Sequence, residues 1–288
     1  MANKPRRNQS VQKTIQLLEL FQSRSELSAR EAADLLRLPI GSIYPILYAL
    51  EDAGYLKRVN GARFMLGYKF LEKANIILRN CDILNVAKPF LYKLSRCYNV
   101  NSHLGILHRW KVIYLHRELG NETPVISEVI GLQEAPYCTA LGKALLSGLT
   151  DDQLIEYIRQ ENFVPLTLKT IIDPNKLLHE IRKVRHNGFA LSIEEAHEGI
   201  IGIGSPIYDF RGAVIGAISI SVAKERYERE KVQLIKAVKG AAAGISEGFG
   251  ACAYIKRREE VIQDQEKTNL NYKAVGQKPN LEWKRRFE

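Results

Sequence analysis

Hydrophobic residues near the start of the chain recur with the spacing of an α-helix. They are Val11, Ile15, Leu18 and Phe21. Residues three or four positions apart lie on one face of a helix. The pattern predicts a helix over Ser10–Phe21, with the side chain of Ser10 as its N-cap.

Two further helices are predicted before residue 54. Leu27–Leu36 repeats the helical spacing, and Ser28 stands three residues before Glu31, which is the arrangement of a capping box. A short turn then leads to a third helix over about Ser42–Ala53. Gly54 is placed to end this helix in a left-handed conformation.

A β-hairpin is predicted directly after the third helix. Tyr55–Val59 and Arg63–Leu66 are short β-like runs on either side of Asn60-Gly61, a dipeptide typical of tight hairpin turns. Pro45 fits the preceding helix if Ser42 is the N-cap, because N–H groups in a first turn have no intrahelical partner. Three helices and a hairpin make a winged helix-turn-helix, which we expect to span residues 1–68.

The rest of the chain mixes helical and strand-like patterns. Residues 69–86 are predicted to form a linker helix, residues 87–250 a second domain, and residues 251–288 a charged C-terminal extension. Strand-like patterns occur at 99–109, 111–119, 124–130, 189–193, 200–208 and 213–221, and helical patterns at 139–148, 151–160, 173–187 and 227–249. This combination predicts an α+β fold, with a GAF-like mixed sheet and helices at one end or face.

The net charge of +10 is distributed unevenly along the chain. Residues 1–80 hold 13 basic and 7 acidic residues, residues 81–255 hold 20 and 19, and residues 256–288 hold 9 and 6. The basic excess therefore lies at the two ends. Such a distribution favours a nucleic-acid-binding head joined to a body with another role, with a basic protein carrying a charged tail as the alternative.

Several protein classes are disfavoured by the sequence. The longest apolar run, Ala213–Ile220, is far shorter than the roughly 20 residues that span a bilayer. The first ten residues lack the apolar region of a secretory signal. The cysteines, Cys81, Cys97, Cys138 and Cys252, have no CxxC spacing. We therefore expect a cytoplasmic protein with no membrane contact and no bound metal.

Three long motifs resemble the IclR family of bacterial transcriptional regulators, over about residues 8–250. LSAREAADLLRLPIGSIYPILYALEDAGYL, followed by RFMLG, resembles the helix-turn-helix and wing of that family. PYCTALGKALLSGL and GFALSIEEAHEGIIGIGSPIYDFRGAVIGAISIS resemble two signature segments of its effector-binding domain. Their order behind a winged helix makes the resemblance specific.

The resemblance implies a ligand-responsive transcriptional regulator. It would bind a double-stranded DNA operator as a homodimer or homotetramer and respond to a small carboxylate effector, such as a sugar acid, keto acid or aromatic acid. We expect a repressor of a catabolic operon. This chain departs from the family in two places. Ile40-Gly41-Ser42 and Pro45 replace the usual Lys-Ser-Thr and Arg of the recognition helix, and Ser192 and Gly202 replace an acidic residue and a Cys at the effector site.

DNA binding would rest on residues around the third helix as well as on it. Most affinity for DNA comes from phosphate contacts. The candidates for these are Arg6 and Arg7 in an N-terminal arm, Arg30 in the second helix, and Lys57, Arg58 and Arg63 in the wing. The candidates for base contacts are Ser42, Ile43, Tyr44 and Tyr48. Ile43 and Tyr44 are alternatively packed in the core, where Ile46, Leu47 and Leu50 are expected.

The effector would bind where the helix that follows Thr139 begins. With Thr139 as the N-cap, the N–H groups of Ala140, Leu141 and Gly142 would point outward and favour an anion. Ser192 and Glu194 are candidates for bonds to ligand hydroxyls, although Glu194 is alternatively a solvated strand end and Thr139 a cap alone. Ile126, Ile200 and Gly202 are expected to form an apolar floor, with Gly202 leaving room for a larger ligand.

Two other functional classes remain open. A sensor or adaptor without sequence-specific DNA binding is favoured by the absence of Lys and Arg from Leu38 to Leu56. An enzyme would need Cys138, whose thiol precedes a helix N-terminus where its pKa would fall. No spacing fixes a histidine beside it, so we assign no catalytic residue, cofactor or metal ligand.

Overall fold

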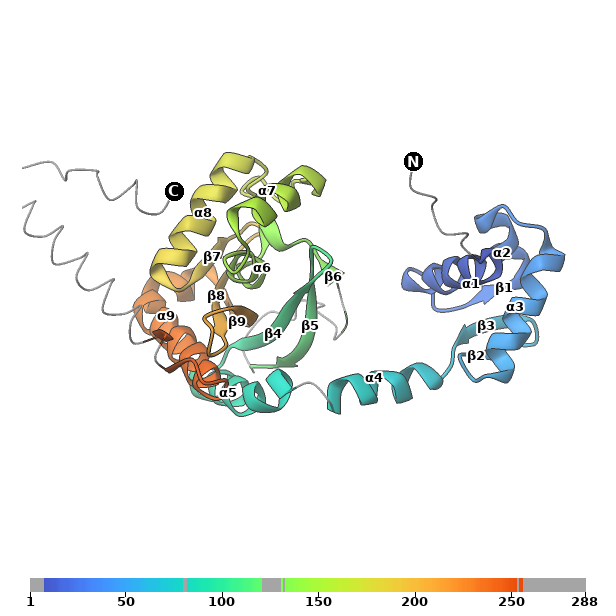
Figure 1. Ribbon diagram of the computed structural model, residues 1–288, viewed down its shortest axis with the longest axis horizontal. Coiled ribbons are helices and arrows are strands. Elements are labelled where there is room, and N and C mark those ends of the chain that lie inside the picture. Colours follow the sequence, from blue (N-terminus) through green and yellow to red (C-terminus); the bar gives the residue numbers. More distant parts are fainter. Residues whose placement is uncertain (1–7, 80–81, 121–130, 132, 253, 256–288) are drawn as a thin grey trace, which may run out of the picture. The chain divides into compact units, whose positions relative to one another are not determined.

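The computed structural model describes residues 8–79, 82–120, 131, 133–252, 254 and 255. The chain divides into two compact units, Met1–Cys81 and Asp82–Glu288. In Figure 1 the first unit holds short helices beside a small sheet, and the second holds a larger sheet covered by helices.

The first unit has the winged helix-turn-helix fold predicted from the sequence. Its helices are α1 (Gln9–Glu19), α2 (Ala29–Leu36) and α3 (Ile40–Asp52), and a 3₁₀ turn, Leu20–Gln22, follows α1. Its strands are β1 (Leu27–Ser28), β2 (Leu56–Val59) and β3 (Arg63–Leu66). They form an antiparallel sheet in the order β1-β3-β2.

The starts of the first two helices are set by side-chain caps. Asn8, not Ser10, is the N-cap of α1, because its backbone is extended and its Oδ1 accepts from the N–H of Ser10 at 3.0 Å. The predicted cap at Ser10 is therefore wrong. The capping box of α2 is confirmed: the Ser28 hydroxyl accepts from the N–H of Glu31 at 3.2 Å, and the Glu31 carboxylate accepts from the N–H of Ser28 at 2.8 Å.

The third helix begins two residues earlier than predicted. α3 starts at Ile40, and the N–H of Ser42 already donates to the carbonyl of Pro39 at 2.8 Å. Pro45 is thus the sixth helical residue and lies beyond the first turn. It has no N–H for the carbonyl of Gly41, so the expectation that no helical hydrogen bond is lost is wrong. Gly41 itself is exposed.

The wing turns where the sequence predicts. Asn60 and Gly61 both have positive φ, 47° and 81°, and Val59 pairs with Arg63 across the turn. Gly54 has a φ of 77° just beyond the end of α3, as expected for a left-handed helix terminus. Asn and Gly adopt this conformation with little strain, which explains why the hairpin forms here.

Two helices follow the wing. α4 (Lys69–Arg79) belongs to the first unit, and α5 (Asp82–Tyr98) to the second, since the division falls between Cys81 and Asp82. The predicted linker range 69–86 therefore covers α4 and the first residues of α5.

The second unit is built on a six-stranded sheet in the order β6-β5-β4-β9-β8-β7. Its strands are β4 (Asn101–His108), β5 (Lys111–Glu118), β6 (Gln133–Glu134), β7 (Ala190–Ile193), β8 (Ile200–Tyr208) and β9 (Val214–Ala223). All the pairings among these strands are antiparallel, where the sequence suggested a mixed sheet. The strand predicted at 124–130 lies outside the described residues.

Helices cover both faces of this sheet, not one end or face as predicted. They are α5, α6 (Ala140–Leu146), α7 (Asp151–Gln160), α8 (Pro174–Asn187) and α9 (Lys224–Glu247), and a 3₁₀ turn, Pro136–Cys138, precedes α6. In Figure 1, α5 and α9 lie on one side of the sheet and α6 to α8 on the other. The central strands β8 and β9 are therefore buried almost throughout, which explains their nearly continuous apolar sequence.

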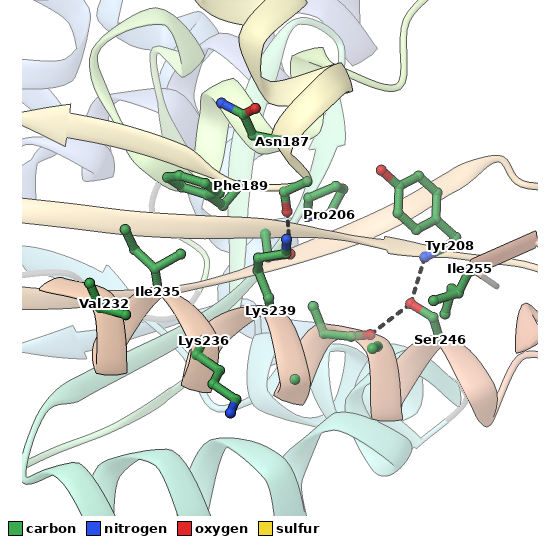
Figure 2. A pocket seen from close by; sticks show the side chains of 15 residues that line it. Asn187, Phe189, Pro206, Tyr208, Val232, Ile235, Lys236, Lys239, Ser246 and Ile255 are labelled. Carbon is green, nitrogen blue, oxygen red and sulfur yellow. Dashed lines mark hydrogen bonds between the residues drawn. The ribbon is translucent and has the colours of Figure 1, made fainter. Parts of the chain in front are cut away.

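A groove of about 610 Å³ runs between α9 and β8 (Figure 2). Its walls include Phe189, Pro206, Tyr208, Val232, Ile235 and Lys239. At one end the N–H of Tyr208 donates to the Ser246 hydroxyl at 2.9 Å, which donates in turn to the carbonyl of Ala242 at 2.7 Å. These bonds attach the end of α9 to β8.

Among the helices that the structure describes, none has both the length and the apolar character needed to cross a bilayer.

Candidate DNA-binding surface and effector cavity

The outer face of α3 is aromatic. Tyr44 and Tyr48 are 40% and 44% exposed, and their rings stack with centroids 5.7 Å apart. Ser42 is half-buried near the start of the same helix. Of the residues predicted to contact bases, these three reach the surface and carry hydroxyl groups that can bond to base edges.

Ile43 does not reach the surface. Its side chain is fully buried in the core of the first unit, Met1–Cys81, which we call the head. It belongs to the cluster that also contains Leu17, Leu47 and Phe64. A thymine methyl group could contact it only if this core were unpacked. The predicted base contact of Ile43 is therefore wrong, and the alternative position in the core is correct. Leu47 is also buried, with Ile46 and Leu50 packed against the cluster, as expected.

Arg58 in the wing is paired with an acidic residue of α3. Its Nε lies 3.2 Å from Oε1 of Glu51 and its Nη2 lies 2.8 Å from Oε2. The guanidinium also lies 5.3 Å from the ring centroid of Tyr48. Glu51 therefore offsets the charge that Arg58 was predicted to offer to phosphate. Because the pair is exposed to solvent, exchanging Glu51 for a phosphate costs little.

Arg63 is held by two carboxylates. Its Nε lies 2.7 Å from Oε1 of Glu26, and its Nη2 lies 3.0 Å from Oε2 of Glu31. Glu31 also caps α2, so its position is set by the helix as well as by Arg63. A phosphate would have to compete with both acids for Arg63.

The remaining predicted cations differ in their surroundings. Arg30 is exposed on α2 and forms no ion pair with a described residue. The ammonium of Lys57 lies 3.4 Å from the hydroxyl of Tyr68 and 4.6 Å from its ring centroid. Both keep a charge that no described carboxylate offsets. Arg6 and Arg7 lie outside the described residues.

In the second unit, a small cavity of about 40 Å³ lies where α6 begins. It is lined by Tyr114, Thr139, Ala140, Leu141, Ser192, Ala196, His197, Ile200, Gly202, Ser219, Ile220 and Ser221. The sequence predicted six of these: Thr139, Ala140, Leu141, Ser192, Ile200 and Gly202. Gly142 and Glu194 were also predicted but do not line the cavity, and Ile126 lies outside the described residues.

Thr139 is the N-cap of α6, as expected, and it also lines the cavity. Its Oγ1 accepts from the N–H of Gly142 at 3.0 Å, so this N–H is not available to a ligand, contrary to the prediction. A Cβ at Gly142 would lie 2.3 Å from the Cα of Pro136, which shows that glycine is needed there for close packing. The N–H groups of Ala140 and Leu141 form no hydrogen bond with a described residue.

Gly202 lies opposite Ser192 in the β7–β8 pairing. A Cβ at Gly202 would lie 3.1 Å from the Cβ of Ala140 and 3.5 Å from that of Ser192. The missing side chain therefore lets α6 approach the sheet and does not provide the larger ligand space that was expected. The Ser192 hydroxyl donates to the carbonyl of Cys138 at 2.8 Å, so it is already engaged.

Glu194 faces away from the cavity into a charged cluster. Its carboxylate pairs with Lys169, accepts from the N–H of Gly199 at 3.1 Å, and lies 3.2 Å from the ammonium of Lys224. The hydrogen bond from Lys169, followed by that from Gly199, lowers the pKa of the Glu194 carboxyl to about 2. Neither predicted alternative holds: Glu194 is not a cavity residue, and it is too well buried to be a solvated strand end.

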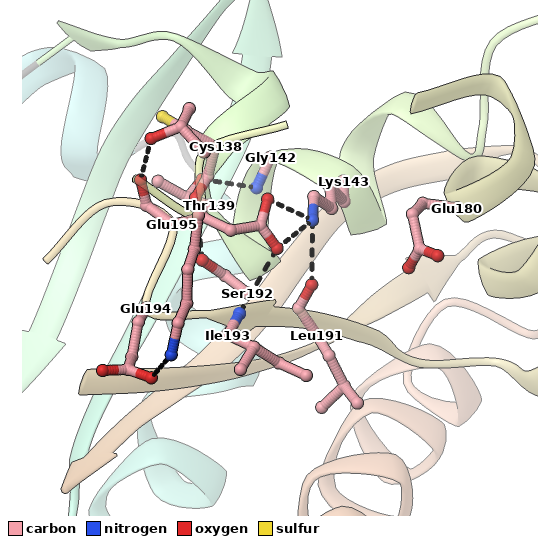
Figure 3. A network of polar contacts seen from close by, with 12 residues as sticks. Cys138, Thr139, Gly142, Lys143, Glu180, Leu191, Ser192, Ile193, Glu194 and Glu195 are labelled. Atoms are coloured by element: carbon pink, nitrogen blue, oxygen red, sulfur yellow. Dashed lines mark hydrogen bonds and ion pairs between the residues drawn. The ribbon is translucent and has the colours of Figure 1, made fainter. Parts of the chain in front are cut away.

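The adjacent residue, Glu195, forms a buried ion pair with Lys143 of α6 (Figure 3). The Lys143 ammonium lies 2.6 Å from each carboxylate oxygen and donates to the carbonyl of Leu191 at 3.0 Å. The side chains are 1% and 6% exposed. Burial raises the pKa of the Glu195 carboxyl, and the Lys143 charge opposes that shift.

These contacts hold the turn that joins β7 to β8, Glu194–Gly199. The Thr170 hydroxyl donates to the carbonyl of Glu195 at 2.7 Å, and the Thr167 hydroxyl donates to that of Glu194 at 2.6 Å. The same turn carries Ala196 and His197 to the wall of the cavity. The ion pair and the threonines therefore determine where one wall of the cavity stands.

Cys138 does not have the surroundings of a reactive thiol. It is buried, and its Sγ donates to the carbonyl of Ala135 at 3.3 Å. Burial raises the pKa of this thiol to about 12, which is opposite to the lowering expected at a helix N-terminus. Among the residues that the structure describes, no group of three or more His, Cys, Asp and Glu side chains could hold a metal ion.

The sequence interpretation missed the buried Lys143–Glu195 pair and the serines of β9, Ser219 and Ser221. Lys143 could have been found, because burying a lysine in an otherwise apolar helix (ALGKALL) is costly unless a carboxylate pairs with it. The serines alternate along an apolar strand, and only the register of β9 shows that they face α6.

Comparisons with known proteins now identify the family. Two family models match the chain: the IclR helix-turn-helix domain over residues 10–60, and the C-terminal domain of the bacterial transcriptional regulator IclR over residues 76–247. The second match alone covers more than half of the chain. The chain belongs to the IclR family.

This IclR-family chain is 30% identical to the HTH-type transcriptional regulator KipR of Bacillus subtilis over 245 residues, covering 85% of this chain and 98% of KipR. Its fold is similar to the crystal structure of a transcriptional regulator from Rhodococcus sp. RHA1, with a TM-score of 0.75, 26% identity, and 85% and 99% of the two chains covered. An IclR homologue of Microbacterium hydrocarbonoxydans, complexed with 4-hydroxybenzoate, shares the fold with a TM-score of 0.74, 19% identity, and 84% and 99% covered.

These relatives are transcriptional regulators, so the expectation of a DNA-binding regulator and not an enzyme is confirmed. The α+β organisation, with an N-terminal winged helix and a C-terminal effector-domain fold, is confirmed as well.

Proposed function

We propose that this regulator is a repressor of a catabolic operon whose affinity for operator DNA is set by a small carboxylate bound at the α6 cavity. The observation that carries this proposal is the set of hydrogen-bond donors at the cavity. The N–H groups of Ala140 and Leu141 and the hydroxyls of Ser219 and Ser221 have no partner among the described residues. Unpartnered donors that converge on a cavity are typical of a ligand-binding site.

A carboxylate matches this set chemically. Its two oxygens accept up to about four hydrogen bonds, enough for the two N–H groups and the two serine hydroxyls named above. No acidic side chain lines the cavity to repel it. The apolar wall of Ile200 and Ile220 would contact the carbon skeleton of a sugar acid, keto acid or aromatic acid. The Microbacterium homologue, which binds a ligand of the last class, has the same fold.

Ligand binding would have to enlarge the cavity. At about 40 Å³ it has room for only a few water molecules, whereas sites for small organic ligands are usually several hundred Å³. We expect the His197 end of the Glu194–Gly199 turn to move outward, while Glu194 and Glu195 stay anchored by their ion pairs. A ligand that binds one conformation of this turn more tightly than another would shift the population toward that conformation. The affinity for the operator would change as a result, typically by about 1–3 kcal/mol.

We further propose that the protein acts in the cytoplasm as a homodimer or homotetramer. Winged helices commonly bind pairs of DNA half-sites in this way. Each subunit would bind one half-site. It would contact bases through Ser42, Tyr44 and Tyr48, and phosphates through Arg30 and the wing. The N-terminal arginines, Arg6 and Arg7, would bind the same half-site.

A carboxylate panel tests the effector proposal. Sugar acids, keto acids and aromatic acids are added to the protein bound to fluorescent DNA from upstream of its own gene, and release is followed by anisotropy. Ser221→Val should abolish the response by removing a donor and filling the cavity, while operator affinity without ligand is retained. Ser147→Ala, which removes a hydroxyl at the other end of α6, is the matched control and should respond normally. An unchanged response of Ser221→Val would reject this cavity as the effector site.

The charges of the winged helix-turn-helix unit favour a second candidate function. The solvent face of α3 has no cation, and Arg58 and Arg63 are paired with acids. These observations favour a small-molecule sensor or adaptor with little sequence-specific DNA binding. That alternative predicts equal affinity for operator and scrambled DNA.

A further inference from the structure

The groove between α9 and β8 is separate from the effector cavity, since the two share no lining residue. Its apolar wall includes Phe189, Pro206, Ile235 and Val232, of which Val232 is 75% exposed. Lys236 and Lys239 also line it, and neither forms an ion pair with a described residue. An exposed apolar surface beside unpaired cations is typical of a binding surface.

The chain itself continues from this groove. Ile255 is the last described residue and lines the groove, and Figure 2 shows it beside Tyr208 and Ser246 at one end. The family match ends at residue 247, so residues 256–288 lie beyond it. The residues that follow Ile255 read KRREEVI, in which two glutamates precede two β-branched apolar residues.

We propose that residues 259–262 of the same chain occupy this groove, with Glu259 and Glu260 beside the lysines and Val261 and Ile262 on the apolar wall. The segment and the groove are complementary in composition. The segment has acidic and apolar side chains, and the groove supplies cations and apolar surface and is lined by no acidic side chain. In Figure 2 the Lys239 side chain extends toward Phe189 and Pro206, into the space that the glutamates would enter.

The dimensions support the same register. Along α9, at about 1.5 Å per residue, Lys239 lies about 10 Å from Ser246, Lys236 about 15 Å and Val232 about 21 Å. An extended chain advances up to about 3.4 Å per residue. If the chain beyond Ile255 is extended, Glu259 could reach up to about 14 Å from Ser246 and Ile262 up to about 24 Å. In that case the glutamates would come level with the two lysines, and Ile262 with Val232.

Disulfide trapping in the full chain tests this placement. Val232→Cys is combined with Ile262→Cys in a background with Ser at positions 81, 97 and 252, since Cys97 and Cys252 are exposed. The matched control is Gln233→Cys with Ile262→Cys. Gln233 is also exposed on α9 but points about 100° away from Val232 and does not line the groove. Cross-linking under mild oxidation is followed by non-reducing gel electrophoresis, which distinguishes bonds within a chain from bonds between chains. Peptide mass mapping then identifies the bonded residues.

We expect the 232–262 bond to form within one chain, about ten-fold or more faster than the 233–262 bond. Lys239→Glu should slow it about two- to five-fold at low salt, and adding Glu259→Lys with Glu260→Lys should restore it. Equal rates at positions 232 and 233 would overturn the proposal. Bonds found only between chains would overturn it too, because a second copy would then be the occupant.

Discussion

The head and the body of this regulator use ion pairs in opposite ways. In the head, Arg58–Glu51 lies at the surface, with side chains 40% and 27% exposed. In the body, Lys143–Glu195 has side chains only 1% and 6% exposed. A solvated pair is worth little and can be exchanged for another partner, whereas a buried pair is costly to break because one charge is left without a partner. The head can therefore offer its charge to DNA, while the body holds a turn in place.

The largest effect is expected from breaking the buried pair. Lys143→Met should lower the free energy of unfolding of the body by about 3–5 kcal/mol, because Glu195 would remain buried without its cation. Urea denaturation measures this. Replacing both partners, Lys143→Met with Glu195→Leu, should recover most of the loss. The matched surface change, Arg58→Met, should cost less than about 1 kcal/mol. Similar losses for Lys143→Met and Arg58→Met would contradict the distinction between the two pairs.

A smaller effect, a gain in DNA affinity, is expected from breaking the surface pair Arg58–Glu51 of the head. Glu51→Gln should release Arg58 and raise the affinity for DNA about two- to five-fold at low salt, with the gain disappearing as salt screens the phosphate contact. Anisotropy titrations at several salt concentrations measure it. Glu72→Gln, which frees Lys69 on α4, is a control of equal charge change. A loss of affinity in Glu51→Gln would show that Glu51 positions Arg58 and does not compete with DNA.

The smallest effect concerns pH and the Glu194 cluster. The folded-state pKa of Glu194, about 2, lies below its ordinary value of 4.5, so its contribution to stability is complete above pH 4.5 and is lost as the pH falls toward 2. Glu194→Gln removes that contribution at every pH. The difference in denaturation midpoint between the two proteins should therefore be largest near neutral pH and should narrow between pH 4.5 and 2. A difference that stays constant over this range would exclude an ionised Glu194 as the stabilising form.

Local signals in the sequence predicted much of the fold. The capping box at Ser28, the Asn60-Gly61 turn and the glycine terminus at Gly54 each involve residues close in sequence, and all three are present in the structure. The start of α3 was misplaced because Ser42 is a good N-cap by residue type, yet the helix extends back to Ile40.

The site was harder to predict because its contacts join distant segments. Thr139 and Ser192 were expected at the cavity, and the structure places both there. Glu194 was expected to face the cavity, but its positive φ of 56° and its pairing with Lys169 and Lys224 direct it elsewhere. No residue near Glu194 in the sequence reveals those partners.

The central claim is that this head recognises DNA through surface ion pairs and hydroxyl groups, in place of a basic recognition helix. Fluorescence anisotropy tests it most directly. The full-length protein is titrated onto DNA from upstream of its own gene and onto scrambled DNA of equal length, at several salt concentrations. We predict tighter binding to the upstream DNA at every salt concentration, and loss of most of that preference in Tyr44→Ala. Equal, steeply salt-dependent binding to both DNAs would contradict sequence recognition by α3.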